Sequence, residues 1–235
     1  MLIVEDLCKQ YVHGGEVRTL FRDLSFTVQP GERLAVLGRN GQGKSTLLKI
    51  LGGVTPATAG RVTWGMSSSW PLGFTGAFQG GMTGYDNIQF IARIYNRPPR
   101  WLIDQVDRFA ELGSALAMPV RFYSSGMRAR LAFGLSVAIE FDCYIIDEVI
   151  QVGDAAFQHK CKDELFNQRQ ERTFIIASHD MSFLREICER AIIVEGGRAK
   201  FFENLDVALD IYQTIIEDHE RAQAAAYTRV AGVAA

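Results

Sequence analysis

A glycine-rich segment near residue 40 carries the residue types and the spacing that bind nucleotide phosphates. Its sequence GRNGQGKS, residues 38–45, matches the pattern G-x-x-x-x-G-K-[ST] in full. Glycines let successive backbone N–H groups point at phosphate oxygens, and a helix that begins here adds a partial positive charge. Lys44 would reach the β- and γ-phosphates and stabilise the charge that develops there, and Ser45 would offer its hydroxyl to Mg²⁺. We therefore expect a nucleotide to contact Gly38, Arg39, Asn40, Gly41, Gln42, Gly43, Lys44, Ser45 and Thr46.

Two carboxylates follow a second apolar run and are typical of a hydrolytic site. Residues 143–146 predict a buried strand, and Asp147 and Glu148 come directly after it. In an α/β sheet, ligands bind outside the carboxyl ends of the strands. Asp147 would hold Mg²⁺ directly or through water, and Glu148 would polarise the attacking water as a general base. The less favoured alternative is a solvated helix start, and beside a complete phosphate-binding segment we favour the catalytic interpretation.

His179 follows a third predicted strand, residues 173–177, and would therefore lie at the same edge of the sheet. An imidazole at that position can donate a hydrogen bond to a γ-phosphate oxygen. A lone histidine is more often structural, so this catalytic assignment depends on the convergence of three strand ends.

The strand and helix pattern predicts an α/β fold whose core sheet is largely parallel. Residues 85–140 contain three predicted helices and no strand, which indicates a helical subdomain. Residues 66–84 are too rich in glycine for a regular element, and we expect a long functional loop there. The last predicted helix covers residues 205–219, and the Ala-rich tail after Arg221 is expected to fray. The remaining predicted elements are strands at 17–28, 33–37, 61–64, 191–195 and 198–202, and helices at 44–51, 87–95, 101–112, 126–139, 155–170 and 182–188.

Composition narrows the function classes. The 25 Lys and Arg residues against 27 Asp and Glu give a net charge of -2, and a general nucleic-acid binder would carry a basic excess. The sequence has no apolar run of the roughly 18 residues that a membrane helix needs, and its start lacks the features of a signal peptide. The four cysteines show no CxxC spacing, so we expect reduced thiols rather than a zinc site.

The segment YSSGMRARL, residues 123–131, completes a resemblance to the ATPase subunits of ABC transporters that covers nearly the whole chain. It resembles the LSGGQ signature of that family, with Ser125 in place of a glycine and Met127 in place of a glutamine. Ser124 and the amides of Ser125 and Gly126 open a predicted helix and would form a second anion-binding surface, although an ordinary Ser-capped helix has the same pattern. In the family, this surface completes the nucleotide site of a partner subunit.

The resemblance implies further site residues and a domain organisation. Gln79 resembles the glutamine that senses Mg²⁺ and the γ-phosphate, and Asp154 lies where the family has an aspartate after the acidic strand, although the usual text at 149–153 is missing. Tyr11 resembles the aromatic residue that stacks on adenine, and the alternative is a packing role. The implied fold is an ABC-type P-loop nucleotide-binding domain with an antiparallel β subdomain and a helical subdomain, over residues 1–221, followed by a tail at 222–235.

Longer stretches, including SSSWPLGFTGAFQGGMTGYDN and EFDCYIIDEVIQVGDAAFQHKCK, are similar to the ATPases of Gram-negative capsular-polysaccharide exporters. This resemblance implies ATP hydrolysis with Mg²⁺ at the cytoplasmic face of the inner membrane, an ATP-bridged pair of this chain, two permease subunits, and room for periplasmic export partners. Trp70, Phe74 and Phe78 would either receive a permease helix or pack locally. Export of O-antigen or teichoic acid, a soluble ABC ATPase without a transport role, and a non-hydrolysing regulatory module are the alternatives.

Overall fold

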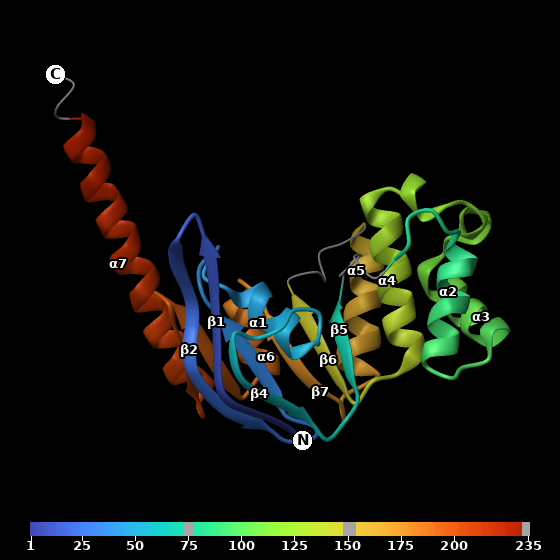
Figure 1. Ribbon diagram of the computed structural model, residues 1–235, viewed down its shortest axis with the longest axis horizontal. Coiled ribbons are helices and arrows are strands. Elements are labelled where there is room, and N and C mark those ends of the chain that lie inside the picture. The colour runs from blue at the N-terminus through green and yellow to red at the C-terminus, as the bar shows by residue number, and fades with distance from the viewer. Residues whose placement is uncertain (73–77, 148–153, 232–235) are drawn as a thin grey trace.

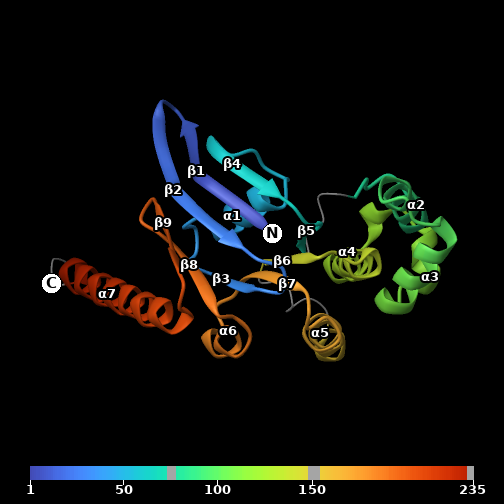
Figure 2. The ribbon, with the colours of Figure 1, turned by 90° about the horizontal axis from the view of Figure 1, so that it is seen from below.

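The computed structural model describes residues 1–72, 78–147 and 154–231, with side chains described as far as residue 223. Its centre is a six-stranded sheet in the order β5-β6-β7-β3-β8-β9 (Figures 1 and 2). The five strands from β5 to β8 run parallel, and β9 pairs antiparallel with β8. This arrangement confirms the predicted α/β class. The strands are β3 (Arg33–Leu37), β5 (Ser68–Leu72), β6 (Cys143–Asp147), β7 (Thr173–Ala177), β8 (Arg190–Glu195) and β9 (Arg198–Phe202).

A second, antiparallel sheet in the order β2-β1-β4 lies beside the first. It consists of β1 (Leu2–His13), β2 (Glu16–Val28) and β4 (Ala59–Trp64). β1 and β2 form a long hairpin whose turn holds Gly14 and Gly15 at φ 59° and 87°, the left-handed conformations that a tight hairpin turn requires. The sequence pattern indicated β2 but not β1.

The helix α1 (Lys44–Leu51) lies between the two sheets and completes one apolar core. Its Leu47 and Leu48 are fully buried among residues of the hairpin and of the parallel sheet, such as Phe21 and Val36. The opposite face of the parallel sheet is covered by α5 (Ala155–Lys162), a π-helix at Asp163–Asn167, α6 (Met181–Ile187) and the first part of α7 (Leu205–Ala231).

The helical subdomain contains α2 (Gly84–Ile94), α3 (Pro99–Ala110) and α4 (Ser125–Ile139), with two short 3-10 turns between α3 and α4 at Gly113–Ala117 and Val120–Phe122. Thr83 and Asp86 form a capping box that fixes the start of α2. Gly134 lets α3 and α4 approach closely, because a Cβ there would lie 3.3 Å from both Val106 O and Ala110 Cβ. Figures 1 and 2 show this subdomain as a lobe on the far side of β5 and β6 from α1.

Three expectations from the sequence were wrong. The glycine-rich stretch 66–84 contains a strand, β5, which lies at the edge of the sheet where Pro71 removes no ladder bond that the sheet needs. The last helix, α7, continues through residue 219 and the Ala-rich tail to Ala231, because alanine favours helix. The helix predicted at 155–170 divides into α5 and the π-helix.

Candidate functional site

The phosphate-binding loop, residues 38–45, joins β3 to α1, which confirms the predicted strand–loop–helix order. Gly38, Gly41 and Gly43 have φ angles of 151°, 78° and 114°, a region of backbone conformation that favours glycine. Gly38 has a second reason to be glycine, because a Cβ there would lie 2.4 Å from the carbonyl oxygen of Val194 in β8. The loop is therefore held in its curved shape by its own glycines and by the neighbouring strand.

Replacing Gly38 with alanine should destabilise the chain strongly. Gly38→Ala combines an unfavourable φ with a collision against backbone, and we expect a loss of about 3 kcal/mol or more in the free energy of unfolding, measured by urea titration. The control is Gly53→Ala, which has φ +70° but no atom within 4 Å of the added Cβ. It should cost only about 1 kcal/mol. Equal losses in the two variants would contradict the role given to the Val194 contact.

Lys44 is buried and folded back onto the loop. Its Nζ donates to Gly38 O at 2.6 Å and lies 3.5 Å from both Arg39 O and His179 Nε2. His179 Nε2 in turn lies 3.0 Å from Asn40 Oδ1. The predicted convergence of strand ends is thus present for β3 and β7, since the imidazole and the ammonium group meet at the end of the loop.

Ser45 and Asp147 bring the third strand end into the site. Ser45 Oγ donates to Asp147 Oδ1 at 3.1 Å, so a hydroxyl and a carboxylate from α1 and β6 face each other. An oxygen pair of this kind suits Mg²⁺, which keeps several waters and takes its other ligands from substrate phosphates. The described residues contain no cluster of three or more His, Cys, Asp or Glu side chains that could hold a metal ion. The predicted base, Glu148, lies outside the described residues.

A cavity of about 650 Å³ opens between the phosphate-binding loop and the β1–β2 hairpin. Its size is ordinary for a small-molecule site. Tyr11 lines it with 46% of its surface exposed, and Lys9 Nζ lies 4.7 Å from the centre of the Tyr11 ring. The lining residues are Tyr11, His13, Glu16, Arg18, Leu20, Arg39, Asn40, Gly41, Gly43, Lys44, Ser45 and Thr46. The predicted aromatic residue therefore shares one cavity with seven of the nine predicted phosphate contacts, and the other two, Gly38 and Gln42, do not line it.

The turn between β8 and β9 braces the loop from another side. The Arg39 guanidinium pairs with the Glu195 carboxylate at 2.5 Å, and this hydrogen bond raises the pKa of Arg39 above its ordinary value. The Gly196 N–H donates to Gln42 Oε1 at 3.1 Å. These contacts fix two side chains of the loop to the core sheet.

Gln79 lies where the chain enters the helical subdomain. Its backbone N–H donates to Asn87 Oδ1 at 2.9 Å, and Asn87 Nδ2 donates back to Gln79 O at 3.2 Å. The Gln79 side chain itself is exposed. Gln79 is thus anchored to α2 through its backbone, which leaves the side chain available for the predicted contact with Mg²⁺.

Ser124, Ser125 and Gly126 lie at the start of α4, as predicted. Ser124 is the N-cap, and its Oγ accepts a hydrogen bond from the Met127 N–H at 3.2 Å. Because α4 lies in the separate helical lobe, these residues are not brought to the cavity beside Tyr11 (Figure 1). Ser124 and Ser125 are exposed, so their surface is free to meet another molecule.

Asp154 links α5 to α4. Its Oδ1 accepts from the Phe157 N–H at 2.9 Å as the N-cap of α5, and its Oδ2 accepts from Arg130 at 2.8 Å. The Phe157 N–H, helped by Arg130, lowers the pKa of Asp154. Asp154, which was predicted to belong to the nucleotide site, thus joins the start of α5 to α4 in this structure.

Comparison with known proteins decides the family. A model of the ABC transporter family matches residues 21–151, more than half of the chain. The chain belongs to the ABC transporter family. It is 48% identical over 215 residues to the capsule polysaccharide export ATP-binding protein CtrD of Neisseria meningitidis serogroup B, covering 92% of this chain and 100% of that protein. It is 47% identical to the ATP-binding protein BexA of Haemophilus influenzae, covering 90% and 98%.

The chain is also similar to more distant proteins, one by sequence and one by fold. The teichoic acids export ATP-binding protein TagH of Staphylococcus haemolyticus is 34% identical, over 85% of this chain and 76% of that protein. A dimeric structure of the ATP-binding cassette MJ0796, in a post-hydrolysis state with ADP and Pi, superposes with a TM-score of 0.73 at 20% identity, covering 87% of this chain and 99% of the other. The latter likeness confirms the ABC cassette fold expected from the sequence.

The sequence did not indicate the residues that the β1–β2 hairpin contributes to the cavity. His13, Glu16, Arg18 and Leu20 line it together with Tyr11. No local motif marks them, because they reach the cavity through the pairing of two strands rather than through spacing along the chain. The alternation of residues on β2 would have placed Arg18 and Leu20 on one face, but not against the loop of an ABC cassette.

Proposed function

We propose that this chain is the ATP-hydrolysing subunit of an ABC exporter that powers the export of capsular polysaccharide across the inner membrane. The observation that carries the proposal is the cavity between the phosphate-binding loop and the hairpin. Of its lining residues, Ser45 bonds to Asp147 and Lys44 lies beside His179. Identity of nearly one half to CtrD and BexA over their whole length supports capsular polysaccharide as the cargo. The lower identity to TagH, about one third, makes export of another polysaccharide, such as teichoic acid, the alternative function.

ATP would lie along the cavity with its base at Tyr11 and its phosphates in the loop. Lys44 Nζ, which donates to Gly38 O, would exchange this internal bond for β- and γ-phosphate oxygens. The freed loop amides and the start of α1 would complete the cradle. Ser45 and Asp147 would hold Mg²⁺, with Gln79 approaching from the helical subdomain, and the ion would supply neutralisation of phosphate charge.

Hydrolysis would depend on groups at the ends of β6 and β7. Glu148, which follows Asp147 in the sequence, would accept a proton from the attacking water. His179 lies 3.0 Å from Asn40 Oδ1 and 3.5 Å from Lys44 Nζ, so it would donate to a γ-phosphate oxygen. Lys44 would stabilise the charge that develops during the reaction.

The signature-like surface would act on a second copy of the chain. Ser124 and Ser125 are exposed and Gly126 is half-buried at the start of a 15-residue helix, where a phosphate is favoured. They lie in the lobe away from the cavity of their own chain, so a head-to-tail pair would use them over the partner's ATP. Asp154, beside the start of α5, would contribute near the same interface.

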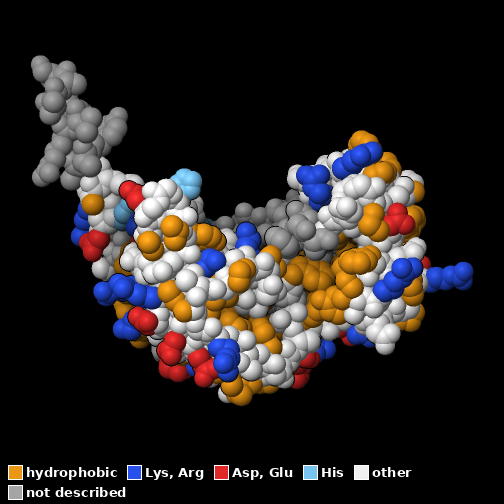
Figure 3. All heavy atoms as spheres, viewed as in Figure 1, with side chains coloured by type: hydrophobic (Ala, Val, Ile, Leu, Met, Phe, Trp, Pro, Cys, Tyr) orange, Lys and Arg blue, Asp and Glu red, His pale blue; other side chains and the backbone are white. Residues whose placement is uncertain are grey.

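The chain would work at the cytoplasmic face of the inner membrane with two permease subunits. Within the described residues, no helix is long and apolar enough to cross a bilayer, so membrane passage would be the task of another protein. Figure 3 shows hydrophobic side chains gathered between β5 and the helical lobe. On α2, Phe90 and Ile94 are 54% and 58% exposed and lie one turn apart. We assign these two residues to the permease contact.

Trp70, Phe74 and Phe78 were the aromatic residues expected at the permease contact, and the two that the structure describes are at least partly packed. Trp70 packs against Tyr95 and Phe141, with ring centres 6.1 and 5.6 Å apart, so its ring takes part in local packing. Phe78 is half-buried against the same core, and Phe74 lies outside the described residues. The exposed α2 residues are therefore the better candidates for the permease contact.

A double variant tests the permease contact. Phe90→Ser with Ile94→Ser should lower the amount of integral-membrane permease that co-purifies with the tagged chain from membranes by about 30-fold, since two apolar contacts worth about 1 kcal/mol each would be lost. ATP affinity should stay unchanged. The matched control is Val207→Ser with Ile211→Ser, an equally spaced exposed pair on α7. Recovery of the same amount of permease with the two double variants would contradict the assignment.

A phosphate-release assay on the purified chain tests the enzymatic part of the proposal. With ATP and Mg²⁺ the chain should release inorganic phosphate, and chelation of Mg²⁺ should abolish the release. Binding of ATP without any release would favour the regulatory-module alternative.

A further inference from the structure

The β1–β2 hairpin presents two cross-strand pairs to the cavity. In the register of the two strands, Tyr11 lies directly opposite Arg18, and His13 lies opposite Glu16. Side chains that are directly opposite in an antiparallel pair project from the same face. All four residues line the cavity of about 650 Å³. Tyr11, whose ring is proposed to meet the base, therefore has Arg18 as its neighbour on the same face of the hairpin.

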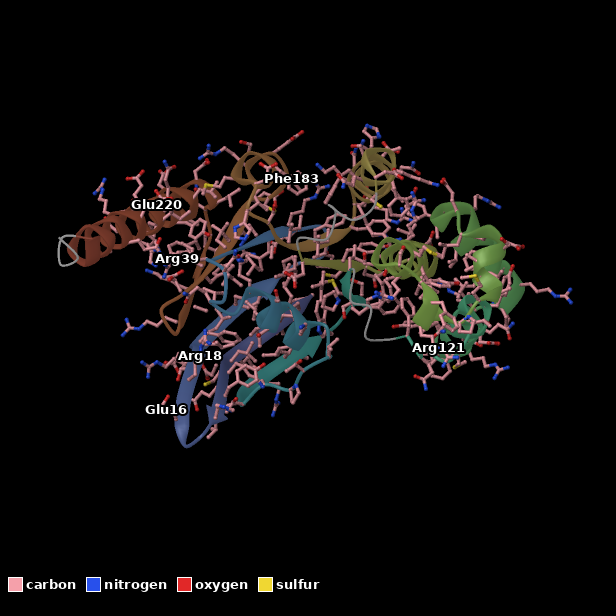
Figure 4. The ribbon with its side chains drawn as sticks, turned by 90° about the horizontal axis from the view of Figure 1, so that it is seen from above. Glu16, Arg18, Arg39, Arg121, Phe183 and Glu220 are labelled. Atoms are coloured by element: carbon pink, nitrogen blue, oxygen red, sulfur yellow. The ribbon has the colours of Figure 1, made fainter. Side chains whose placement is uncertain are left out.

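Strand β2 contacts the phosphate-binding loop at two points. Arg18 Nη2 donates to Gly41 O at 2.9 Å. Two residues along, the Leu20 side chain lies so close to Gly43 that a Cβ on this glycine would be 3.2 Å from Leu20 Cβ. Residues two apart on a strand project from the same face, so one face of β2 is docked on the loop. In the view of Figure 4, Arg18 lies on β2 between Glu16 and Arg39 of the loop.

Packing does little to fix the outer part of the hairpin. Val12 and Val17, which flank the Tyr11–Arg18 pair toward the tip, are 72% and 60% exposed. A two-stranded hairpin without an apolar face is marginally stable. Tyr11 is tied to its own sheet by Lys9, whose ammonium lies over the ring and donates to Pro56 O at 2.9 Å. The Arg18–Gly41 hydrogen bond connects the strand opposite Tyr11 to the phosphate-binding loop, and so it helps to set the distance between the Tyr11 ring and the loop.

We propose that Arg18 is a positioning residue for nucleotide recognition. It holds the hairpin at the distance from the loop at which Tyr11 meets the base while the phosphates occupy the loop, and it acts through Tyr11 rather than on the phosphates. The proposal rests on the proposed function, because it needs ATP to lie in this cavity. It assigns nucleoside recognition to a contact that joins the antiparallel sheet to the parallel core.

Calorimetry on the full chain separates the nucleoside from the phosphates. The two probes are a non-hydrolysable ATP analogue, adenylyl imidodiphosphate, and inorganic tripolyphosphate, each with Mg²⁺. Arg18→Ala should raise the Kd of the analogue about tenfold and leave that of tripolyphosphate within about twofold, since the charge-assisted hydrogen bond that is lost joins the hairpin to a loop carbonyl and not to a phosphate. Arg18→Lys, which keeps a cationic donor, should recover part of the affinity.

A double-mutant cycle shows whether Arg18 acts through Tyr11. If it does, Arg18→Ala combined with Tyr11→Ala should bind the analogue no more weakly than Tyr11→Ala alone. The control is Arg22→Ala, an exposed arginine of the same strand that lines a different cavity with Asp23 and Arg198, and it should change neither affinity.

Two outcomes overturn the inference while leaving the proposed function intact. Equal loss of tripolyphosphate and analogue affinity in Arg18→Ala would show that Arg18 acts on the phosphates. If the fold-increases in the Kd of the analogue for Arg18→Ala and Tyr11→Ala multiply in the double variant, Arg18 acts independently of Tyr11. Failure of the wild-type chain to bind either probe would instead overturn the proposed function itself.

Discussion

Replacing Lys44 with alanine should weaken ATP binding by between about 10- and 100-fold, because a buried ammonium that would donate to two phosphate groups is lost. The structure makes this effect specific. Lys44 is 7% exposed and donates to Gly38 O inside the loop, so its amine lies where the phosphates would bind. The measurement is the Kd of ATP by calorimetry.

A matched control on the same helix isolates the effect of position from that of charge. Lys49 lies in the last turn of α1, away from the loop, and Lys49→Ala should leave ATP affinity unchanged. Thermal melting of both variants shows whether each is folded. Wild-type affinity in a folded Lys44→Ala variant would contradict the assignment of the loop as the phosphate site.

Replacing Glu148 with glutamine should lower the rate of phosphate release by about 100-fold or more, the range that a positioned general base contributes. Glutamine keeps the shape of the side chain but accepts no proton from water. ATP affinity should not fall, since Asp147, Ser45 and Lys44 remain. The measurement is steady-state phosphate release at saturating ATP.

The control for this variant is Glu171→Gln, which removes one exposed carboxylate before β7. Its turnover should equal that of the wild type. Unchanged turnover in Glu148→Gln would remove Glu148 from the role of base, and the base would then have to be sought among other groups at the ends of β6 and β7.

Local sequence was sufficient where chemistry depends on neighbours in the chain. The glycines of the loop, Lys44 and Ser45 occur within eight residues, and their spacing alone placed them between a strand and a helix, as the structure has them. The parallel order of the sheet then brought Asp147 and His179 to the same edge, since the carboxyl ends of parallel strands lie together.

Contacts between distant segments could not be predicted in this way. Arg18 reaches Gly41 because β2 is docked on the loop, and no spacing within β2 states this. Asp154 binds Arg130 where α4 and the start of α5 meet, beside the contact of the Phe133 and Phe157 rings. Glu195 meets Arg39 across more than 150 residues for the same reason. Each is a tertiary contact between segments that were predicted separately.

Secondary structure failed where tertiary context outweighed local propensity. The sequence of β5, SSWPL, contains a proline and has no clear alternation of apolar and polar residues. It is nevertheless a strand, because it pairs with β6 and Ser69 Oγ accepts a hydrogen bond from the Ile145 N–H. β1 was missed although its residues Leu2, Val4 and Leu7 are buried, because the charged residues between them obscure the alternation.

The central claim is that ATP joins two copies of this chain, with Ser124 of each closing over the ligand of the other. Light scattering on Glu148→Gln with saturating ATP and Mg²⁺ tests it most directly, because that variant should retain its nucleotide. The account predicts the mass of two chains with ATP and of one chain, 26.2 kDa, without it. A mass of one chain under saturating ATP would contradict it.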